Sequence, residues 1–290
     1  MNAAARTHSP GSVSSTCQNC KSQFVIEPDD FAFYEKIKVP PPTWCPECRL
    51  IRRLTFRNER TLYRRSCDLC HASIVTLYPT NSPFPVYCVP CWYSDTWDPL
   101  EYGQAYDFSR PFFAQFRELQ QKVPHPALYV INAVNSEYAN QSKDIKNVYL
   151  GTSIINAENV CYSYRIDDSR DVLDTAFGRN IERCSNSTDL LDCNNVHFSR
   201  YAKGSYDGRL LYDVRGSRDC FGCVGLRNKQ YCLFNEQLTK EAYRSALAEW
   251  DTGSYRTLQK GLERLRALVA SHPKRFAMTD NVVQSTGDNL

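Results

Sequence analysis

The amino-acid sequence predicts a mainly β protein in which two small cysteine-rich modules precede a parallel β-solenoid, with C-terminal helices capping the solenoid. Three observations carry this prediction. Four Cys-x-x-Cys pairs occupy the N-terminal third, a twelve-residue pattern repeats through the second half, and leucines recur at helical spacing near the C-terminus. The 290 residues are enough for two or three modest domains.

The first segment, MNAAARTHSPGSVSST (residues 1–16), is expected to be a disordered tail. It lacks the apolar stretch of a signal peptide, and no part of the chain approaches the roughly 18 apolar residues of a membrane helix. The sequence therefore favours a cytoplasmic protein with no membrane contact. In that compartment thiols stay reduced, and paired cysteines hold metal more often than they form disulfides.

The four Cys-x-x-Cys pairs predict two zinc ribbons, over residues 17–60 and 61–98. A two-residue gap lets a tight turn direct both thiolates at one ion, and two such turns complete the tetrahedral set that zinc prefers. Sequential and cross-braced combinations of the pairs both stay open. With four thiolates each, the two Zn²⁺ ions would be structural. The predicted ligands are Cys17, Cys20, Cys45, Cys48, Cys67, Cys70, Cys88 and Cys91.

Positive charge is concentrated between the second and third cysteine pairs, although the net charge of the whole chain is only +3. Seven arginines and one carboxylate lie between Cys48 and Cys67. Pro46 predicts the start of a helix that runs from about Glu47 to Arg60. Leucine and isoleucine in this helix (Leu50, Ile51, Leu54) would pack against a ribbon. The predicted basic stripe consists of Arg49, Arg53, Arg57 and Arg60 on one helix face and Arg64 in the strand that follows.

Three interpretations of this stripe stay open. Arginine suits bidentate phosphate contacts and stacking on bases, which favours a nucleic-acid surface. Alternatively, the acidic segment 95–107 covers the arginines within the chain, or the arginines form a charged helix face that is simply solvated.

An aromatic segment, residues 99–133, is expected to link the ribbons to the second half of the chain. Ser109 and Pro111 predict a helix that continues to about Gln121. Its apolar set would anchor one domain to the next, and this set is Phe112, Phe113, Phe116 and Leu119.

Residues 134–238 repeat in blocks of twelve, which predicts a β-solenoid. The blocks from Lys146 begin KNVYLGTSIINA, ENVCYSYRIDDS and RDVLDTAFGRNI. Small or β-branched residues share two columns that would face inward, and Asn or Asp fills a column where the chain would turn. One or two blocks per turn both stay open. Two blocks would make a core wide enough for Tyr162, Phe198 and Phe234.

The remaining cysteines and acids offer weaker functional signals. Cys184, Cys220 and Cys232 lie in an inward column, where a thiol behaves as a small hydrophobe. The motif CFGC (Cys220–Cys223) has no second pair in register. Turn-forming acids would be expected in a solenoid, although some solenoids cleave polysaccharides with clustered carboxylates. We predict no catalytic residue. The acids concerned are Asp167, Asp168, Asp171, Asp174, Asp189 and Asp192.

Helices are predicted over residues 239–272, where Thr239 caps the first and Leu258, Leu262, Leu265 and Leu268 line the second. They would cover the open end of the solenoid. Residues 273–290 form a polar tail or, because DNVV resembles the opening of another block, the start of a further repeat.

The chain resembles a family of candidate-phylum bacterial proteins that combine tandem zinc ribbons with a repeat domain. The resembling stretches are FAFYEKIKVPPPTWCPECRLIRRLTFRNERTLYRRSCD, WYSDTWDP, DFSRPFF and CFGCVGLRNKQYCLFNEQLTKEAY. The resemblance covers roughly residues 17–245 and implies this fold but no particular activity. Members continue past GDNL with further repeats, which implies that this chain is a fragment.

These observations together predict a zinc-stabilised protein that binds nucleic acid, RNA before DNA. A protein-interaction scaffold, in which the solenoid face binds and the arginines meet an acidic protein, is the alternative. A carbohydrate-active solenoid is the third candidate.

Overall fold

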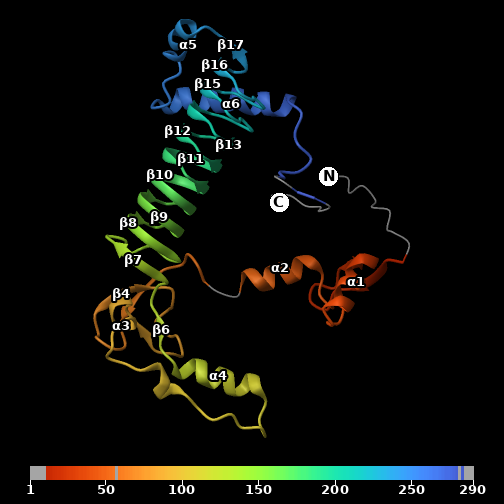
Figure 1. The fold of residues 1–290 in the computed structure, drawn as a ribbon, viewed down its shortest axis with the longest axis vertical. Helices are drawn as coiled ribbons and strands as arrows, with labels where there is room; N and C mark the ends of the chain where they lie inside the picture. The colour runs from red at the N-terminus through yellow and green to blue at the C-terminus, as the bar shows by residue number, and fades with distance from the viewer. Residues whose placement is uncertain (1–10, 56–57, 280–281, 284–290) are drawn as a thin grey trace. The chain divides into compact units, whose positions relative to one another are not determined.

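The computed structural model describes residues 11–55, 58–279 and 282–283. The chain forms two compact units, residues 1–58 and 59–290. Figure 1 shows a small cysteine module in the first unit, and a second module, the solenoid and two capping helices in the second unit. In the described parts of the chain, no helix has the length and apolar character that crossing a bilayer requires.

The first unit is a hairpin followed by two helices. Strand β1 (Val13–Thr16) pairs antiparallel with β2 (Gln23–Ile26), and helices α1 (Pro28–Lys36) and α2 (Pro46–Leu54) follow. Four residues of the expected disordered tail therefore belong to a strand, while residues 1–10 lie outside the described residues.

Helix α2 is shorter than predicted and does not pack as predicted. It ends at Leu54, with Thr55 as its C-cap, instead of continuing to Arg60. Leu50, Ile51 and Leu54 are 47%, 53% and 70% exposed, so the expectation that they pack against the ribbon is wrong. The small core beside the cysteines is already filled by other side chains, namely Phe24, Ile26, Phe31, Tyr34 and Trp44.

The second cysteine module begins the second unit. Strand β3 (Tyr63–Ser66) contains Arg64, as predicted, and pairs antiparallel with β4 (Ser73–Thr76). Strand β5 (Val86–Tyr87) and the short helix α3 (Val89–Trp92) complete the module. Strand β5 pairs in parallel with β6 (His125–Pro126), which leads into the solenoid. A small apolar cluster joins the module to the first coil through Leu77, Leu128 and Val130.

The aromatic segment forms a helix but does not anchor it through its aromatic face. The segment contains a 3-10 turn, η1 (Pro99–Tyr102), and helix α4 (Phe112–Lys122). Phe113 is 80% exposed and Phe112 is 53% exposed. The buried residue is instead Gln115, whose amide donates to the carbonyl oxygens of Asp107 and Arg110 at 2.9 and 3.0 Å. Gln115 thus holds the preceding loop, and the predicted packing of the phenylalanines is wrong.

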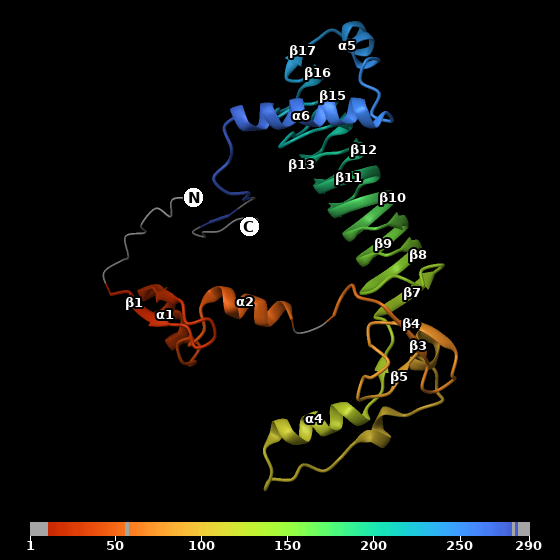
Figure 2. The same ribbon diagram turned by 180° about the vertical axis from the view of Figure 1, so that it is seen from behind.

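The solenoid has about nine turns over residues 130–233 (Figure 2). Strands of neighbouring turns pair in parallel, and the paired residues are twelve positions apart in the sequence. Val148 thus pairs with Val160, and Val160 pairs with Val172. One turn therefore takes one block, which settles the choice left open by the sequence. Its strands are β7 (Val130–Val134), β8 (Ser142–Tyr149), β9 (Thr152–Cys161), β10 (Tyr164–Arg179), β11 (Glu182–Leu191), β12 (Asn194–His197), β13 (Arg200–Lys203), β14 (Tyr206–Arg209), β15 (Arg218–Phe221) and β16 (Gln230–Leu233).

Each turn is narrow because every third residue points inward. In one coil the inward residues are Val148, Gly151, Ile154 and Ala157, all buried. A Cβ at Gly151 would lie 2.5 Å from a methyl group of Val148, so the space holds no larger side chain. Tyr162, expected in a wider core, is instead 53% exposed.

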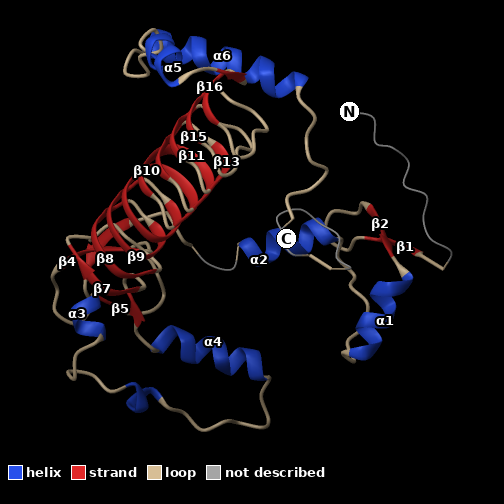
Figure 3. Cartoon of the chain, turned by 45° about the horizontal axis from the view of Figure 1, so that its top comes forward, coloured by secondary structure: helices blue, strands red, loops and turns tan. Residues whose placement is uncertain are grey.

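The residue before each inward position takes a left-handed backbone conformation, which bends the chain into four sides per turn. Asn147, Leu150, Ser153 and Asn156 have φ values between 50° and 59°. Asn and Asp tolerate this region better than most residues, which explains their column in the repeat. Figure 3 shows the resulting stack of short strands.

Buried serines satisfy backbone groups inside the narrow core. The hydroxyl of Ser163 donates to the carbonyl oxygen of Cys161 at 2.8 Å and accepts the amide of Thr175, one coil onward, at 3.2 Å. Ser199 repeats the arrangement with His197 and Leu211. Coils are thus joined by side-chain hydrogen bonds as well as by the strand ladder.

Two helices cap the solenoid, as predicted. Strand β17 (Glu236–Gln237) turns back on β16 and leads to α5 (Lys240–Leu247), whose N-cap Thr239 accepts the amide of Ala242. Helix α6 (Tyr255–Ser271) follows. Leu265 of α6 is buried with Phe221 and Phe234 of the last coils, so Phe234 lies under the cap. The first two residues of the DNVV segment, 280–281, and residues 284–290 lie outside the described residues.

Candidate metal centres and an arginine–tyrosine surface

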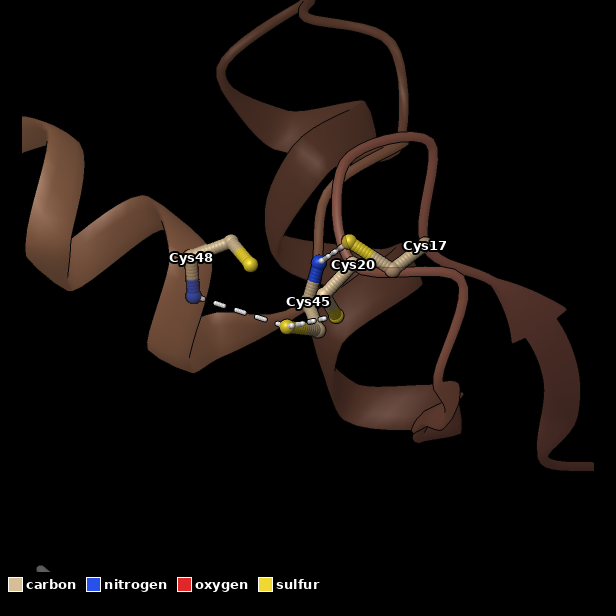
Figure 4. Close-up of side chains that lie close together, drawn as sticks. All are labelled: Cys17, Cys20, Cys45 and Cys48. Carbon is tan, nitrogen blue, oxygen red and sulfur yellow. Dashed lines mark hydrogen bonds between the residues drawn. The ribbon is translucent and has the colours of Figure 1, made fainter.

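The first four-cysteine group brings together the first and second Cys-x-x-Cys pairs, so the pairing is sequential. The sulfur atoms of Cys17, Cys20, Cys45 and Cys48 all lie within 4.8 Å of one another (Figure 4). The first two belong to the turn between β1 and β2. Cys45 is the N-cap of α2, and Cys48 lies in its first turn.

The geometry of this group fits a tetrahedral metal ion. Cys20 and Cys45 Sγ are 3.7 Å apart. Zn–S bonds of about 2.3 Å at tetrahedral angles would place sulfur atoms about 3.8 Å apart. A disulfide would need about 2.05 Å, and every cysteine is free. Backbone amides donate to the sulfurs as well, from Cys45 to Cys17 Sγ at 3.2 Å and from Cys48 to Cys45 Sγ at 3.4 Å.

The second group, Cys67, Cys70, Cys88 and Cys91, repeats this arrangement. Cys88 is the N-cap of α3, and its amide donates to Cys67 Sγ at 3.2 Å. Cys70 and Cys88 Sγ are 3.8 Å apart. The two modules, in different units, thus use the same local design.

The thiols of each group ionise unequally. Burial alone would raise the pKa of Cys17, but amides of Cys45, Cys20 and Asn19 donate to its sulfur and lower the pKa to about 6. Burial likewise opposes ionisation of Cys67, and amides led by that of Cys70 lower its pKa to about 7. Burial raises the pKa of Cys88. Four adjacent thiolates repel one another, so full ionisation of either group requires a cation.

Five of the six solenoid cysteines belong to the core. Cys184, Cys193, Cys220, Cys223 and Cys232 are all at most 2% exposed. Burial raises the pKa of the Cys184 thiol to about 11, which leaves it unreactive at neutral pH. Within the described residues, the CFGC motif belongs to no group of metal-ligating side chains.

Several of the solenoid acids act as hydrogen-bond acceptors in ladders that follow the coils. The carboxylates of Asp168, Asp171 and Asp192 accept side-chain amides of Asn156, Asn159 and Asn180 at 2.7, 2.8 and 3.0 Å. Each partner lies twelve residues earlier. These contacts give those acids a structural role in joining neighbouring coils.

The five predicted arginines are divided between the two units. Arg49 and Arg53 lie on α2 in the first unit, and Arg57 lies outside the described residues. Arg60 and Arg64 belong to the second unit. The continuous stripe on one helix is therefore not formed, because α2 ends at Leu54.

Arg60 and Arg64 meet a row of tyrosines on the first coils of the solenoid. The guanidinium of Arg60 lies 4.1 Å from the ring centroid of Tyr164, and that of Arg165 lies 5.6 Å from the same ring. Arg64 donates to the hydroxyl of Tyr138 at 2.9 Å. We call these residues and their neighbours the arginine–tyrosine surface. It consists of Arg60, Arg64, Tyr138, Tyr149, Tyr162, Tyr164, Arg165 and Phe177.

The aromatic rings of this surface follow successive coils. Ring centroids of Tyr138 and Tyr149 are 5.3 Å apart, and those of Tyr149 and Tyr162 are 5.5 Å apart. Tyr149 and Tyr162 are 43% and 53% exposed. Sequence reasoning missed this row, although Tyr138, Leu150 and Tyr162 stand twelve residues apart in one column of the repeat.

Two arginines of this surface, Arg64 and Arg165, are not neutralised by the acidic segment. Among the ion pairs of the described residues, none joins a carboxylate to Arg64 or Arg165. Asp98 instead accepts the amide of Leu100, and Asp107 accepts the amide and the hydroxyl of Ser109. Two acids of the segment therefore cap local turns.

The fold and these groups define a β-solenoid protein with two four-cysteine groups that could hold metal ions. Comparison of the chain with protein-family models, with curated proteins and with solved structures finds no match. The resemblance to candidate-phylum bacterial proteins stays a prediction.

Proposed function

We propose that this protein binds nucleic acid, RNA before DNA, and that two structural zinc ions hold its cysteine modules. One observation carries the binding proposal: the Tyr164 ring has the guanidinium of Arg60 at 4.1 Å and that of Arg165 at 5.6 Å, beside exposed Tyr149 and Tyr162. Arg49, Arg53 and Arg57 would add phosphate contacts from the first unit.

The two residue types of this surface supply the two parts of such an interaction. Guanidinium groups contact phosphate oxygens through paired donors, and phenol rings stack on bases of any sequence. RNA is favoured because its recognition relies on unpaired bases in loops and at ends. Tyr149 and Tyr164 lie in strands β8 and β10, so the backbone that carries these two rings is already ordered and loses little conformational entropy on binding.

Zinc is proposed from the chemistry of the donors. Four thiolates at tetrahedral spacing suit Zn²⁺ better than calcium or magnesium, which require oxygen ligands. Cys17, Cys20, Cys45 and Cys48 would hold one ion, and Cys67, Cys70, Cys88 and Cys91 the other. Each ion would stabilise its module and leave no position for substrate.

The test is binding of the zinc-loaded protein to cellular RNA and duplex DNA across a salt series. We expect micromolar or tighter binding, with log K falling linearly in log salt at a slope that indicates about three to five phosphate contacts. No binding to either polymer at low salt would contradict the proposal.

A matched pair of variants assigns the binding to the surface. The triple variant Arg60→Ala, Arg64→Ala and Arg165→Ala should bind at least about tenfold more weakly and show a shallower salt slope. The control removes three exposed arginines at the cap, Arg244, Arg256 and Arg266, with the same change in charge. Equal losses in both variants would indicate a general charge effect. Measurements of zinc content and circular dichroism serve as the control that both variants fold.

A protein-interaction scaffold is the second candidate, favoured by the exposed aromatic face of α4. Phe108, Phe112 and Phe113 are 92%, 53% and 80% exposed, an apolar patch of a kind that often marks a protein contact. Absence of nucleic-acid binding would favour this function.

A further inference from the structure

We propose that the arginine–tyrosine surface takes up one unstacked pyrimidine base in a cavity beneath Arg60, so that the ligand is single-stranded nucleic acid. This inference rests on the proposed function and specifies its ligand. The cavity lies where residues 59–62 cross the first coils of the solenoid, and it is lined by Glu59, Arg60, Leu62, Tyr138, Leu150, Tyr162 and Tyr164 among others.

The dimensions of this cavity suit one six-membered ring. Its volume is about 170 Å³. An apolar cavity of about 150 Å³ in another protein accommodates benzene, which is close in size to a pyrimidine. A purine has two fused rings and would fit less well. Phenol rings and Leu150 form much of the wall, which provides the apolar contact that a base loses when it leaves its stack.

The segment that closes the cavity, residues 59–62, is held in place. The side-chain amide of Asn140 donates to the carbonyl oxygen of Glu59 at 3.0 Å, and its oxygen accepts the amide of Tyr129 at 3.1 Å. Asn140 is 1% exposed. This buried amide fixes the segment that carries Arg60 against the first coils, so the cavity is formed before any ligand binds.

Polar groups at the cavity match the edge and the backbone of a nucleotide. Thr152 and the tyrosines supply hydroxyl groups that can hydrogen-bond to a base edge. Arg64 and Arg165 contact two of the lining tyrosines, Tyr138 and Tyr164 respectively. A base in a duplex must first be unpaired and unstacked, which costs free energy, before it can enter a recess, so the geometry favours single strands.

The experiment compares two strands with the same phosphates. Binding of the full zinc-loaded chain to a labelled oligouridylate is measured against an abasic ribose-phosphate strand of equal length, by fluorescence anisotropy in matched salt. We expect the abasic strand to bind at least about tenfold more weakly, the loss typical of one stacked base, with an unchanged salt slope. A duplex of equal length should also bind more weakly.

A cavity-filling variant gives an independent test. Leu150→Trp should occlude the cavity while leaving the arginines, and should weaken uridylate binding about tenfold without changing the affinity for the abasic strand. Tyr206→Leu changes a tyrosine that is 44% exposed and does not line the cavity, so it should have no effect.

Each outcome separates this inference from the function on which it rests. Equal binding of uridylate and abasic strands, in the wild type and in Leu150→Trp, overturns the base cavity but leaves phosphate binding intact. No binding of any strand at low salt overturns the proposed function and the inference together. Equally tight binding of the duplex and the single strand contradicts the inference alone.

Discussion

At the scale of single residues, the solenoid depends on side chains that tolerate a left-handed backbone and also bond to the next coil. Asn147 has a φ of 55°, a region that costs most residues about 1–2 kcal/mol. Its amide donates to Asn159 at 2.9 Å, and Asn159 donates in turn to Asp171 at 2.8 Å. The ladder explains why amides and carboxylates recur in this column.

The ladder predicts a measurable stability difference between two similar asparagines. Asn159→Ala removes a donor and an acceptor in the middle of the ladder and should lower the free energy of unfolding by about 1–2 kcal/mol more than Asn186→Ala. Asn186 is exposed with a φ of 49°, and its side chain forms no hydrogen bond with any described residue, so its replacement measures the contribution of backbone conformation alone. Urea denaturation measures both. Equal losses would show that the ladder contributes nothing beyond backbone conformation.

At the scale of elements, each cysteine module combines a hairpin turn with a helix N-terminus. Cys45 and Cys88 are N-caps whose sulfurs accept the amide of the third helical residue, Cys48 in α2 and Cys91 in α3, at 3.4 Å in each case. The same residues that would hold the metal therefore start the helices. Neither module has a large apolar core, so metal binding should supply much of its folding free energy.

Chelation provides the test of the metal centres. Inductively coupled plasma mass spectrometry of the purified protein should find two zinc ions per chain. Cys20→Ser and Cys70→Ser should each lose one ion, because each breaks one group. Cys161→Ser, in the solenoid and outside both groups, should keep both ions. A strong chelator should unfold the modules but leave the β-sheet signal of the solenoid in circular dichroism.

Two outcomes would contradict this assignment. Loss of both ions in either single variant would mean that the cysteines do not form two separate centres. A metal-free protein with unchanged hydrogen exchange in the modules would show that they fold without metal.

At the scale of the whole molecule, the solenoid is a stack whose repeat equals one turn. Coils pair at an interval of twelve residues from β7 to β16, and the helical cap covers the last coils through Phe221 and Leu265. Each coil contacts mainly its neighbours, so stability is approximately a sum over coils. The stack can therefore lose one complete coil without losing its core.

Deleting one coil tests this architecture. Removal of residues 182–193 joins Ile181 to Asn194 in register and should leave a cooperatively folding protein of somewhat lower stability. Removal of residues 182–192 deletes one residue less and shifts all later inward side chains to the surface, so it should prevent folding or cause aggregation. Thermal unfolding by circular dichroism compares the two. Similar behaviour of both deletions would mean that register does not hold the stack together.

The sequence by itself determined the features that depend on local spacing. The gap within each Cys-x-x-Cys pair predicts a turn whose two thiols could hold a metal ion, the twelve-residue columns predict two of the four inward positions of each turn, and Thr239 with the following leucines predicts the cap. Each of these features needs only residues close in the sequence or at a constant interval, so no distant contact had to be known.

Only the tertiary structure decided how distant segments meet. A twelve-residue period is compatible with one or two blocks per turn, and the pairing of Val148 with Val160 settles it. Helical periodicity could not show that α2 ends at Leu54. Nor could it show that Arg60 meets Tyr164, 104 positions onward. Such contacts form when the chain folds back on itself, and spacing within one segment carries no information about where another segment will lie.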